Sequence, residues 1–85
     1  MQEIRSAVRE FILKEFLPGE DPQNLLDTTP LVTGGILDSI ATLKLVAYLE
    51  ETFGVHFQAH EVDSENLNTV GDIVTLVRSK LPNAQ

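Results

Sequence analysis

Three stretches of this chain place apolar residues three and four positions apart, which is the spacing of an amphipathic helix. In the first stretch the apolar positions are Ile4, Ala7, Val8, Phe11 and Ile12. In the last stretch they are Val70, Ile73, Val74, Val77 and Leu81. The alternating pattern that would indicate strands is nearly absent. The chain is therefore predicted to fold as an all-α protein.

The ends of these helices are marked by capping residues and helix breakers. Pro18-Gly19 ends the first helix. Asp38 is predicted to cap a second helix that begins at Ser39 and ends before Gly54. Thr69 is the predicted cap of the last helix, in a motif that resembles a capping box.

The segments between these helices complete the predicted architecture. Residues 19–37 are rich in Pro, Gly and Thr but hold enough apolar anchors to form a structured loop. Val55-His56-Phe57 allows a short strand, and a helical turn is expected near Ala59–Val62. We expect a small four-helix bundle, with three main helices, one short helix and a long structured loop between the first two. Residues 1–85 are expected to form one domain.

The middle helix carries two sets of apolar residues. One stripe is predicted to be its buried face: Thr42, Leu45, Val46, Leu49 and Phe53. The second set is Ile40, Leu43 and Ala47, on a neighbouring face. This set either widens the buried face or forms an exposed strip that docks partner proteins, with Glu50 and Glu51 as a charged rim.

Composition excludes several classes of function. The net charge of −7 disfavours nucleic-acid binding, and it either keeps the protein soluble or steers it toward basic patches on partners. With no cysteine, the chain has no thiolate nucleophile or thiolate metal site. His56 and His60 lack a clear third ligand, so no metal site is predicted. The start of the chain lacks signal-peptide features, and the richest apolar run, Leu43 to Leu49, is too short for membrane insertion. We expect a cytoplasmic monomer.

Ser39 occupies a position where a helix can stabilise an anion. It stands in the first turn of the middle helix, after Gly34-Gly35 and Asp38. Free N–H groups and the helix dipole would favour a phosphodiester on its hydroxyl, although position alone also fits an ordinary capping residue. No strand–Gly-x-Ser-x-Gly–helix elbow surrounds Ser39, and a bundle of this size offers little enclosed pocket. No catalytic activity is therefore predicted.

Three motifs in order resemble the acyl carrier protein and peptidyl carrier protein superfamily, from Gly34 to about Val77. Gly35-Ile36-Leu37-Asp38-Ser39-Ile40 resembles the Asp-Ser-Leu attachment signature, with Ile40 at the Leu position. Leu49-Glu50-Glu51-Thr52-Phe53-Gly54-Val55 is similar to the segment that ends the family's second helix. Thr69-Val70-Gly71-Asp72-Ile73 is similar to the opening of its last helix. Each motif alone is a weak signal, whereas three in the right order and spacing are a strong one.

This resemblance implies a carrier that acts with other enzymes. Ser39 would accept 4′-phosphopantetheine from coenzyme A, transferred by a phosphopantetheinyl transferase, and Asp38 would assist the Mg²⁺-dependent transfer. The thiol of the arm would hold an acyl or aminoacyl group as a thioester. Adenylating ligases, acyltransferases or synthases would load and use that group in lipid or secondary-metabolite biosynthesis. The family docks its enzymes at the positions of Ile40, Leu43, Ala47, Glu50 and Glu51.

Two residues depart from the pattern of fatty-acid-synthesis carriers. Lys44, which we also assign to the docking face, stands where those carriers usually have Glu, and Ala41 replaces a commonly acidic residue. The reversed charge argues against a housekeeping role in fatty-acid synthesis. The pattern is closer to discrete carriers served by an adenylating ligase, such as the D-alanyl and aminoacyl carrier proteins. The alternative is a carrier-fold interaction or regulatory subunit that acts without the arm, which the intact Asp38-Ser39 pair disfavours.

Overall fold

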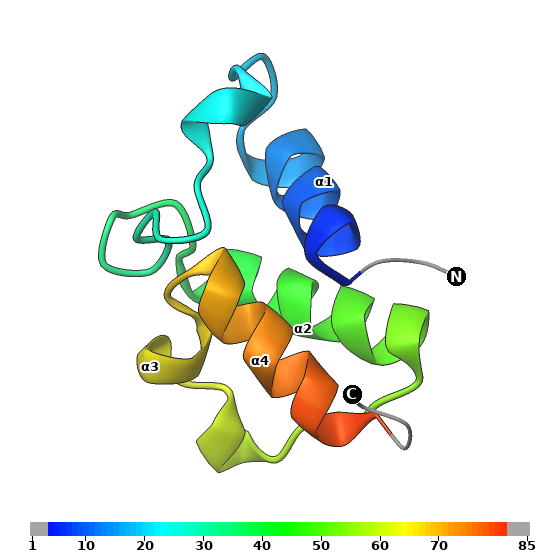
Figure 1. Cartoon of the computed structure of the whole chain (residues 1–85). Coiled ribbons are helices and arrows are strands. Elements are labelled where there is room, and N and C mark those ends of the chain that lie inside the picture. Colours follow the sequence, from blue (N-terminus) through cyan, green and yellow to red (C-terminus); the bar gives the residue numbers. More distant parts are fainter. Residues whose placement is uncertain (1–3, 82–85) are drawn as a thin grey trace.

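The computed structural model describes residues 4–81 and is helical throughout its regular elements (Figure 1). The α-helices are α1 (Ile4–Phe16), α2 (Ser39–Phe53), α3 (Ser64–Leu67) and α4 (Val70–Lys80), with 3₁₀ turns η1 (Pro22–Asn24) and η2 (Ala59–Glu61). No strand occurs between residues 4 and 81. The predicted four-helix architecture, with three main helices and one short helix, is confirmed. None of the described helices is both long enough and apolar enough to span a membrane.

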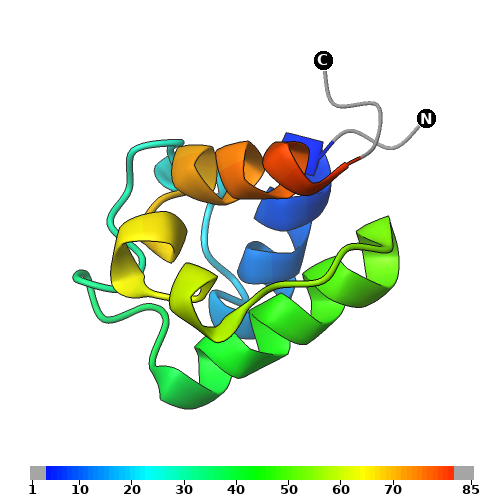
Figure 2. The same ribbon diagram turned by 90° about the horizontal axis from the view of Figure 1, so that it is seen from below.

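The helices enclose one hydrophobic core. In Figure 2, α2 and α4 lie on opposite sides of the molecule and α1 runs between them, in agreement with the contacts of α1 with both. Side chains from all three helices are fully buried there: Val8, Ile12, Leu45, Leu49, Val70, Ile73 and Val77. This arrangement fixes which faces of α2 can reach solvent.

The ends of α2 are defined by the residues that the sequence predicted. The carboxylate of Asp38 accepts a hydrogen bond from the N–H group of Ala41 at 2.7 Å. At the other end, Gly54 adopts a left-handed backbone with φ of 66° and donates its N–H group to the carbonyl oxygen of Glu50. A side chain at this φ would be strained, so Gly54 ends the helix without that cost.

The cap of α4 is also the predicted residue. The hydroxyl of Thr69 accepts from the N–H group of Asp72 at 3.0 Å. The reciprocal bond of a full capping box does not form among the described residues.

The loop between α1 and α2 is held by arginines of α1. The guanidinium of Arg9 donates to the carbonyl oxygen of Leu25 and, at 2.8 Å, to that of Pro22. The guanidinium of Arg5 forms an ion pair with Asp27 at 2.8 Å. Leu25 is also buried in the core. The expectation of a long structured loop is therefore confirmed.

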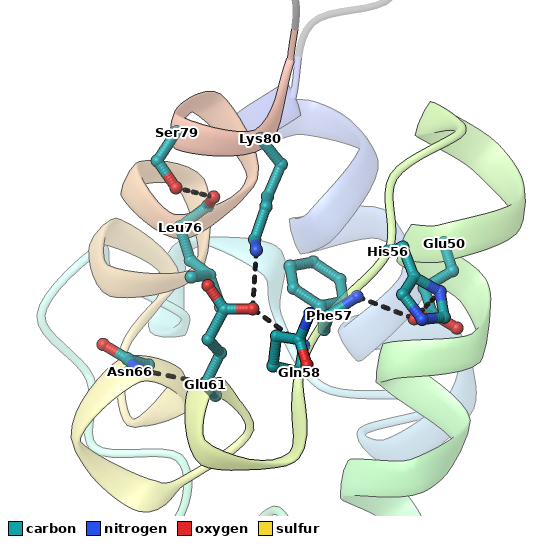
Figure 3. Close-up of polar contacts among 9 residues, drawn as sticks. All are labelled: Glu50, His56, Phe57, Gln58, Glu61, Asn66, Leu76, Ser79 and Lys80. Carbon is teal, nitrogen blue, oxygen red and sulfur yellow. Dashed lines mark hydrogen bonds and ion pairs between the residues drawn. The ribbon is translucent and has the colours of Figure 1, made fainter.

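The segment after α2 differs from its prediction. No strand forms at Val55–Phe57, because no described strand lies beside it to share a ladder of hydrogen bonds. Val55 and Phe57 are instead buried in the core. The carboxylate of Glu50 accepts from the N–H group of Phe57 at 2.9 Å (Figure 3). The predicted helical turn near Ala59–Val62 is present as the 3₁₀ turn η2, whereas the short α-helix α3 begins beyond it, at Ser64, where the sequence predicts no helix.

A charged contact ties η2 to the end of α4. The carboxylate of Glu61 accepts from the N–H group of Gln58 at 2.7 Å and pairs with the ammonium of Lys80 at 2.6 Å (Figure 3). The hydrogen bond from Lys80 is the largest reason that the pKa of Glu61 lies below its ordinary value, and the bond from Gln58 is the next. The segment between α2 and α3 is thus held by carboxylates at two points, Glu50 and Glu61.

Candidate functional site

The hydroxyl group of Ser39 stands at the exposed N-terminus of α2. Ser39 is the first residue of the helix and is exposed to solvent. The N–H groups of Ser39 and Ile40 have no hydrogen-bond partner within residues 4–81, whereas those of Ala41 and Thr42 bond to Asp38. An anion attached to the Ser39 oxygen would therefore meet two free N–H donors and the positive end of the helix dipole.

A tight loop before Ser39 sets the direction in which α2 begins. The carbonyl oxygen of Leu31 accepts from the N–H groups of Ile36 and Leu37, at 2.8 and 2.9 Å. Gly35 has a φ of 83°, and a Cβ atom at Gly34 would collide with the carbonyl oxygen of the proline four residues earlier. The two glycines thus allow the chain to fold back on the buried Leu31.

An open groove of about 560 Å³ runs beside Ser39. Its lining residues come from the loop, from the first two turns of α2 and from the segment that precedes α3: Val32, Leu37, Asp38, Ser39, Thr42, Leu43, Val62 and Asp63. Sequence reasoning missed the contribution of Val62 and Asp63. Their position depends on how the segment after α2 folds back, and no local pattern records that.

The second apolar set of α2 faces solvent. The exposed fraction of both Ile40 and Leu43 is 67%, and Ala47 is also exposed. The alternative in which this set widens the buried face is therefore wrong. Instead, the core face of α2 is extended by Ala41, which is 7% exposed. We call Ile40, Leu43 and Ala47 the apolar strip.

The predicted buried stripe is confirmed in part. Leu45 and Leu49 are fully buried, while Thr42, Val46 and Phe53 are half-buried.

Three charged residues, Lys44, Glu50 and Glu51, border the apolar strip, and they differ in exposure and in hydrogen bonding. Lys44 and Glu51 are exposed, and both line a shallow groove of about 390 Å³ together with Phe11, Glu15, Ala47 and Tyr48. Glu50 is half-buried, and its carboxylate accepts from Phe57 and lies 3.6 Å from His56 (Figure 3). Of the adjacent glutamates, Glu51 is thus open to a partner and Glu50 is engaged in the fold.

Neither histidine belongs to a metal cluster. The side chain of His56 is 86% exposed, and His60 is exposed as well. Within residues 4–81, no three potential metal ligands among His, Cys, Asp and Glu lie together.

Comparisons with known proteins give a consistent result. A family profile described as "Phosphopantetheine attachment site" matches residues 4–77. The acyl carrier protein of Thermotoga maritima is 32% identical over 80 residues, which cover 94% of each chain. The acyl carrier protein of Chlamydia caviae is 29% identical over 77 residues, 91% of this chain and 95% of the relative. A D-alanyl carrier protein of Streptococcus pyogenes is 34% identical over 71 residues, 84% of this chain and 86% of the relative.

Proposed function

This chain belongs to the phosphopantetheine-attachment family of carrier proteins, whose cofactor is covalently bound 4′-phosphopantetheine, and we propose that Ser39 is its attachment residue. The single observation that carries the proposal is the exposed Ser39 hydroxyl, beside two free N–H groups at the start of α2. We propose that the loaded protein carries an acyl or aminoacyl group between enzymes. Members of this family are generally not catalytic themselves, and the chemistry would belong to the partners.

The residues around Ser39 fit the proposed group. A phosphodiester at this oxygen would lie within reach of the free N–H groups of Ser39 and Ile40. The groove beside Ser39 has apolar walls, including Val32 and Val62, along which part of an arm could lie. The chain contains no cysteine, and the terminal thiol of 4′-phosphopantetheine would supply the thioester linkage. The protein itself would present the arm at the exposed start of α2.

Loading exchanges the phosphoanhydride bond of coenzyme A for a phosphodiester bond to Ser39. The Ser39 hydroxyl loses its proton to a base of the transferase or to water, and its oxygen forms a bond to the phosphorus that bears the pantetheine. The pyrophosphate bond of coenzyme A breaks, and adenosine 3′,5′-bisphosphate leaves. One carboxylate oxygen of the exposed Asp38 already caps the helix, while the other makes no hydrogen bond within residues 4–81. We propose that this second oxygen assists the Mg²⁺-dependent transfer that a phosphopantetheinyl transferase performs.

We assign enzyme docking to the apolar strip and its two exposed charges, Lys44 and Glu51. The strip would meet apolar side chains of a partner, and the opposite charges of Lys44 and Glu51 favour a partner that presents both an acidic and a basic group. Glu50 supports this surface indirectly, because its carboxylate is bound to the Phe57 N–H group.

The positive charge of Lys44 bears on which class of enzyme loads the carrier, and therefore on which group it carries. A purely acidic docking helix suits partners with a basic patch, and Lys44 would repel such a patch. Together with the similarity to D-alanyl carrier proteins, this supports an aminoacyl group supplied by an adenylating ligase. The similarity to acyl carrier proteins supports an acyl group supplied by an acyltransferase or synthase, which is the alternative cargo.

The experiment is an intact-mass measurement before and after incubation with coenzyme A, Mg²⁺ and a promiscuous phosphopantetheinyl transferase. Ser39→Ala serves as the control, with circular dichroism to establish that it is folded. We expect the wild-type protein to gain one phosphopantetheinyl group and the variant to gain none. A folded and initially unmodified wild-type protein that gains nothing would favour an interaction subunit that acts without the arm.

A further inference from the structure

Asn68, between α3 and α4, makes an unusual number of contacts with a distant part of the chain. Its side-chain oxygen accepts from the N–H groups of Val32 and Thr33, each at 3.0 Å, and from the Thr33 hydroxyl at 3.3 Å. Its backbone carbonyl oxygen accepts from the N–H group of Leu31. One residue thus receives the backbone N–H groups of three consecutive residues that lie more than thirty positions earlier.

These three N–H groups have no other partner within the described chain. Residues 31–37 form neither helix nor strand. Two carbonyl oxygens inside the loop already accept from later residues: that of Leu31 from the N–H groups of Ile36 and Leu37, and that of Val32 from the N–H group of Gly35. An unpaired backbone N–H group is costly where it is shielded from water. Leu31 is fully buried and the Val32 contact is part-buried, whereas the Thr33 contact is exposed, so the loop conformation depends chiefly on the acceptors that Asn68 offers to Leu31 and Val32.

The part of the loop that Asn68 holds is the part that leads to Ser39. Val32 lines the groove beside Ser39, and Leu37, which directly precedes the Asp38-Ser39 pair, is bonded to Leu31. A shift of Leu31 and Val32 would therefore displace one wall of the groove and the entry into α2. A route of hydrogen bonds connects Asn68 with the start of α2.

On the basis of the proposed attachment at Ser39, we propose that Asn68 is a positioning residue for loading. It holds the loop before Ser39 in the conformation that a phosphopantetheinyl transferase recognises. The role requires a short side chain with an acceptor oxygen. Aspartate keeps that oxygen in the same place, alanine removes it, and glutamine moves it by one methylene group.

The test compares variants of Asn68 with a matched asparagine. Asn66 is on α3, and its side chain donates one hydrogen bond, to the carbonyl oxygen of Glu61 at 3.0 Å, and none to the loop before Ser39. Asn66→Ala therefore controls for loss of an asparagine contact near α3. The readouts are kcat/KM for loading by coenzyme A and a promiscuous transferase, and amide hydrogen exchange at Val32 and Thr33, under conditions in which circular dichroism shows every variant folded.

We expect Asn68→Ala to lower kcat/KM by roughly tenfold or more, since misplacement of a reacting group by about 1 Å can cost about a hundredfold. Exchange at Val32 and Thr33 should accelerate in this variant, while exchange at the core residue Ile73 stays slow. Asn68→Asp should load within about threefold of wild type because it retains the acceptor. Asn66→Ala should load at the wild-type rate.

Two results would overturn the proposal. Folded Asn68→Ala that loads as fast as wild type would show that the contact does not act on loading. A rate for Asn68→Asp as low as that for Asn68→Ala would show that the acceptor oxygen is not the cause. Should Asn68→Ala fail to fold, Asn68→Gln replaces it with the same expected loss. A wild-type protein that is never loaded would refute attachment at Ser39 itself, whereas normal loading of wild type and of Asn68→Ala refutes only the role of Asn68.

Discussion

Two helices of this protein begin with the same dipeptide, Asp38-Ser39 at α2 and Asp63-Ser64 at α3. In both, the aspartate is the N-cap and accepts from the N–H group three residues later, at 2.7 Å from Ala41 and 3.0 Å from Asn66. The local hydrogen bonding is thus the same at both helix starts. Both aspartates also line the groove beside Ser39.

The two starts differ in what surrounds them. α2 continues for 15 residues and exposes the apolar strip, whereas α3 has only four residues. The loop before Asp38 is held by Asn68, while Asp63 follows η2 directly. If Ser39 alone is the attachment residue, as proposed, an aspartate cap and a serine are insufficient for attachment. The helix length, the exposed strip and the fixed loop distinguish Ser39.

The largest expected effect tests the division of α2 into a buried and an exposed face. Leu45→Ala, at a fully buried position, should lower the free energy of unfolding by about 2–5 kcal/mol. Leu43→Ala, at a position that is 67% exposed, should change it by less than about 0.5 kcal/mol. Urea denaturation measures both. If Leu43→Ala is as destabilising as Leu45→Ala, the strip belongs to the core. A Leu43→Ala variant that is as stable as wild type but is loaded more slowly would support a role of the apolar strip in docking the transferase.

The next prediction compares two roles of Asp38 and Asp63: stabilisation of the helix as an N-cap, and assistance in phosphopantetheine transfer. Asp38→Ala and Asp63→Ala should each cost about 1 kcal/mol of stability, because each removes an N-cap. Asparagine caps nearly as well, so Asp38→Asn and Asp63→Asn should retain that stability. Measured rates of phosphopantetheine loading should then be lower than wild type for Asp38→Asn and equal to wild type for Asp63→Asn. Equal loading by these two asparagine variants would remove the proposed role of Asp38 in transfer.

The adjacent residues Glu50 and Glu51 test the distinction between a side chain that stabilises the fold and one that faces partners. Glu50→Ala should cost about 1 kcal/mol, because the N–H group of the buried Phe57 loses its acceptor. Glu51→Ala should change the stability by less than about 0.5 kcal/mol. Thermal unfolding followed by circular dichroism compares the two variants. Equal losses of stability would contradict the assignment of Glu50 to the fold.

The smallest expected effect is a pH dependence of hydrogen exchange. It should differ between the segment before α3, which Glu61 holds, and the loop before α2, which Asn68 holds. The folded-state pKa of Glu61 lies below its ordinary value of 4.5, chiefly because of the hydrogen bond from Lys80. Its contribution to stability is therefore present above about pH 4.5 and is lost as the pH falls through the folded-state pKa. Protection of the Gln58 amide from hydrogen exchange, corrected for the intrinsic rate, should decrease in acid. The amides of Val32 and Thr33 should be less affected, because the acceptor oxygen of Asn68 does not titrate. A greater loss of protection at Val32 than at Gln58 would contradict this difference.

The main helices could be predicted from sequence because their signals are local. The apolar spacing of α1 and α4 and the caps Asp38, Gly54 and Thr69 act within a few residues of one another. The motif around Ser39 likewise identified the candidate residue. These signals depend on the helical repeat and on capping chemistry, which a sequence displays directly.

Other features could not be predicted because they depend on contacts between distant residues. Asn68 looks like an ordinary residue before a helix, yet its partners are Val32 and Thr33. Glu50 and Glu51 are neighbours with the same chemistry, and only the path of the chain after Gly54 brings Phe57 to one of them. The short helix α3 has too few residues for a repeating apolar pattern.

The most direct test of the central claim is to locate the attached group within the loaded wild-type protein. Cleavage after lysine and arginine places Ser39 and Ser64 in separate peptides, residues 15–44 and 45–78, each with a single serine. Mass spectrometry of the peptides should show one phosphopantetheinyl group, on Ser39 of the first peptide. A group on the second peptide, or on both, would contradict the proposal that the surroundings of Ser39, rather than the Asp-Ser pair itself, determine the site.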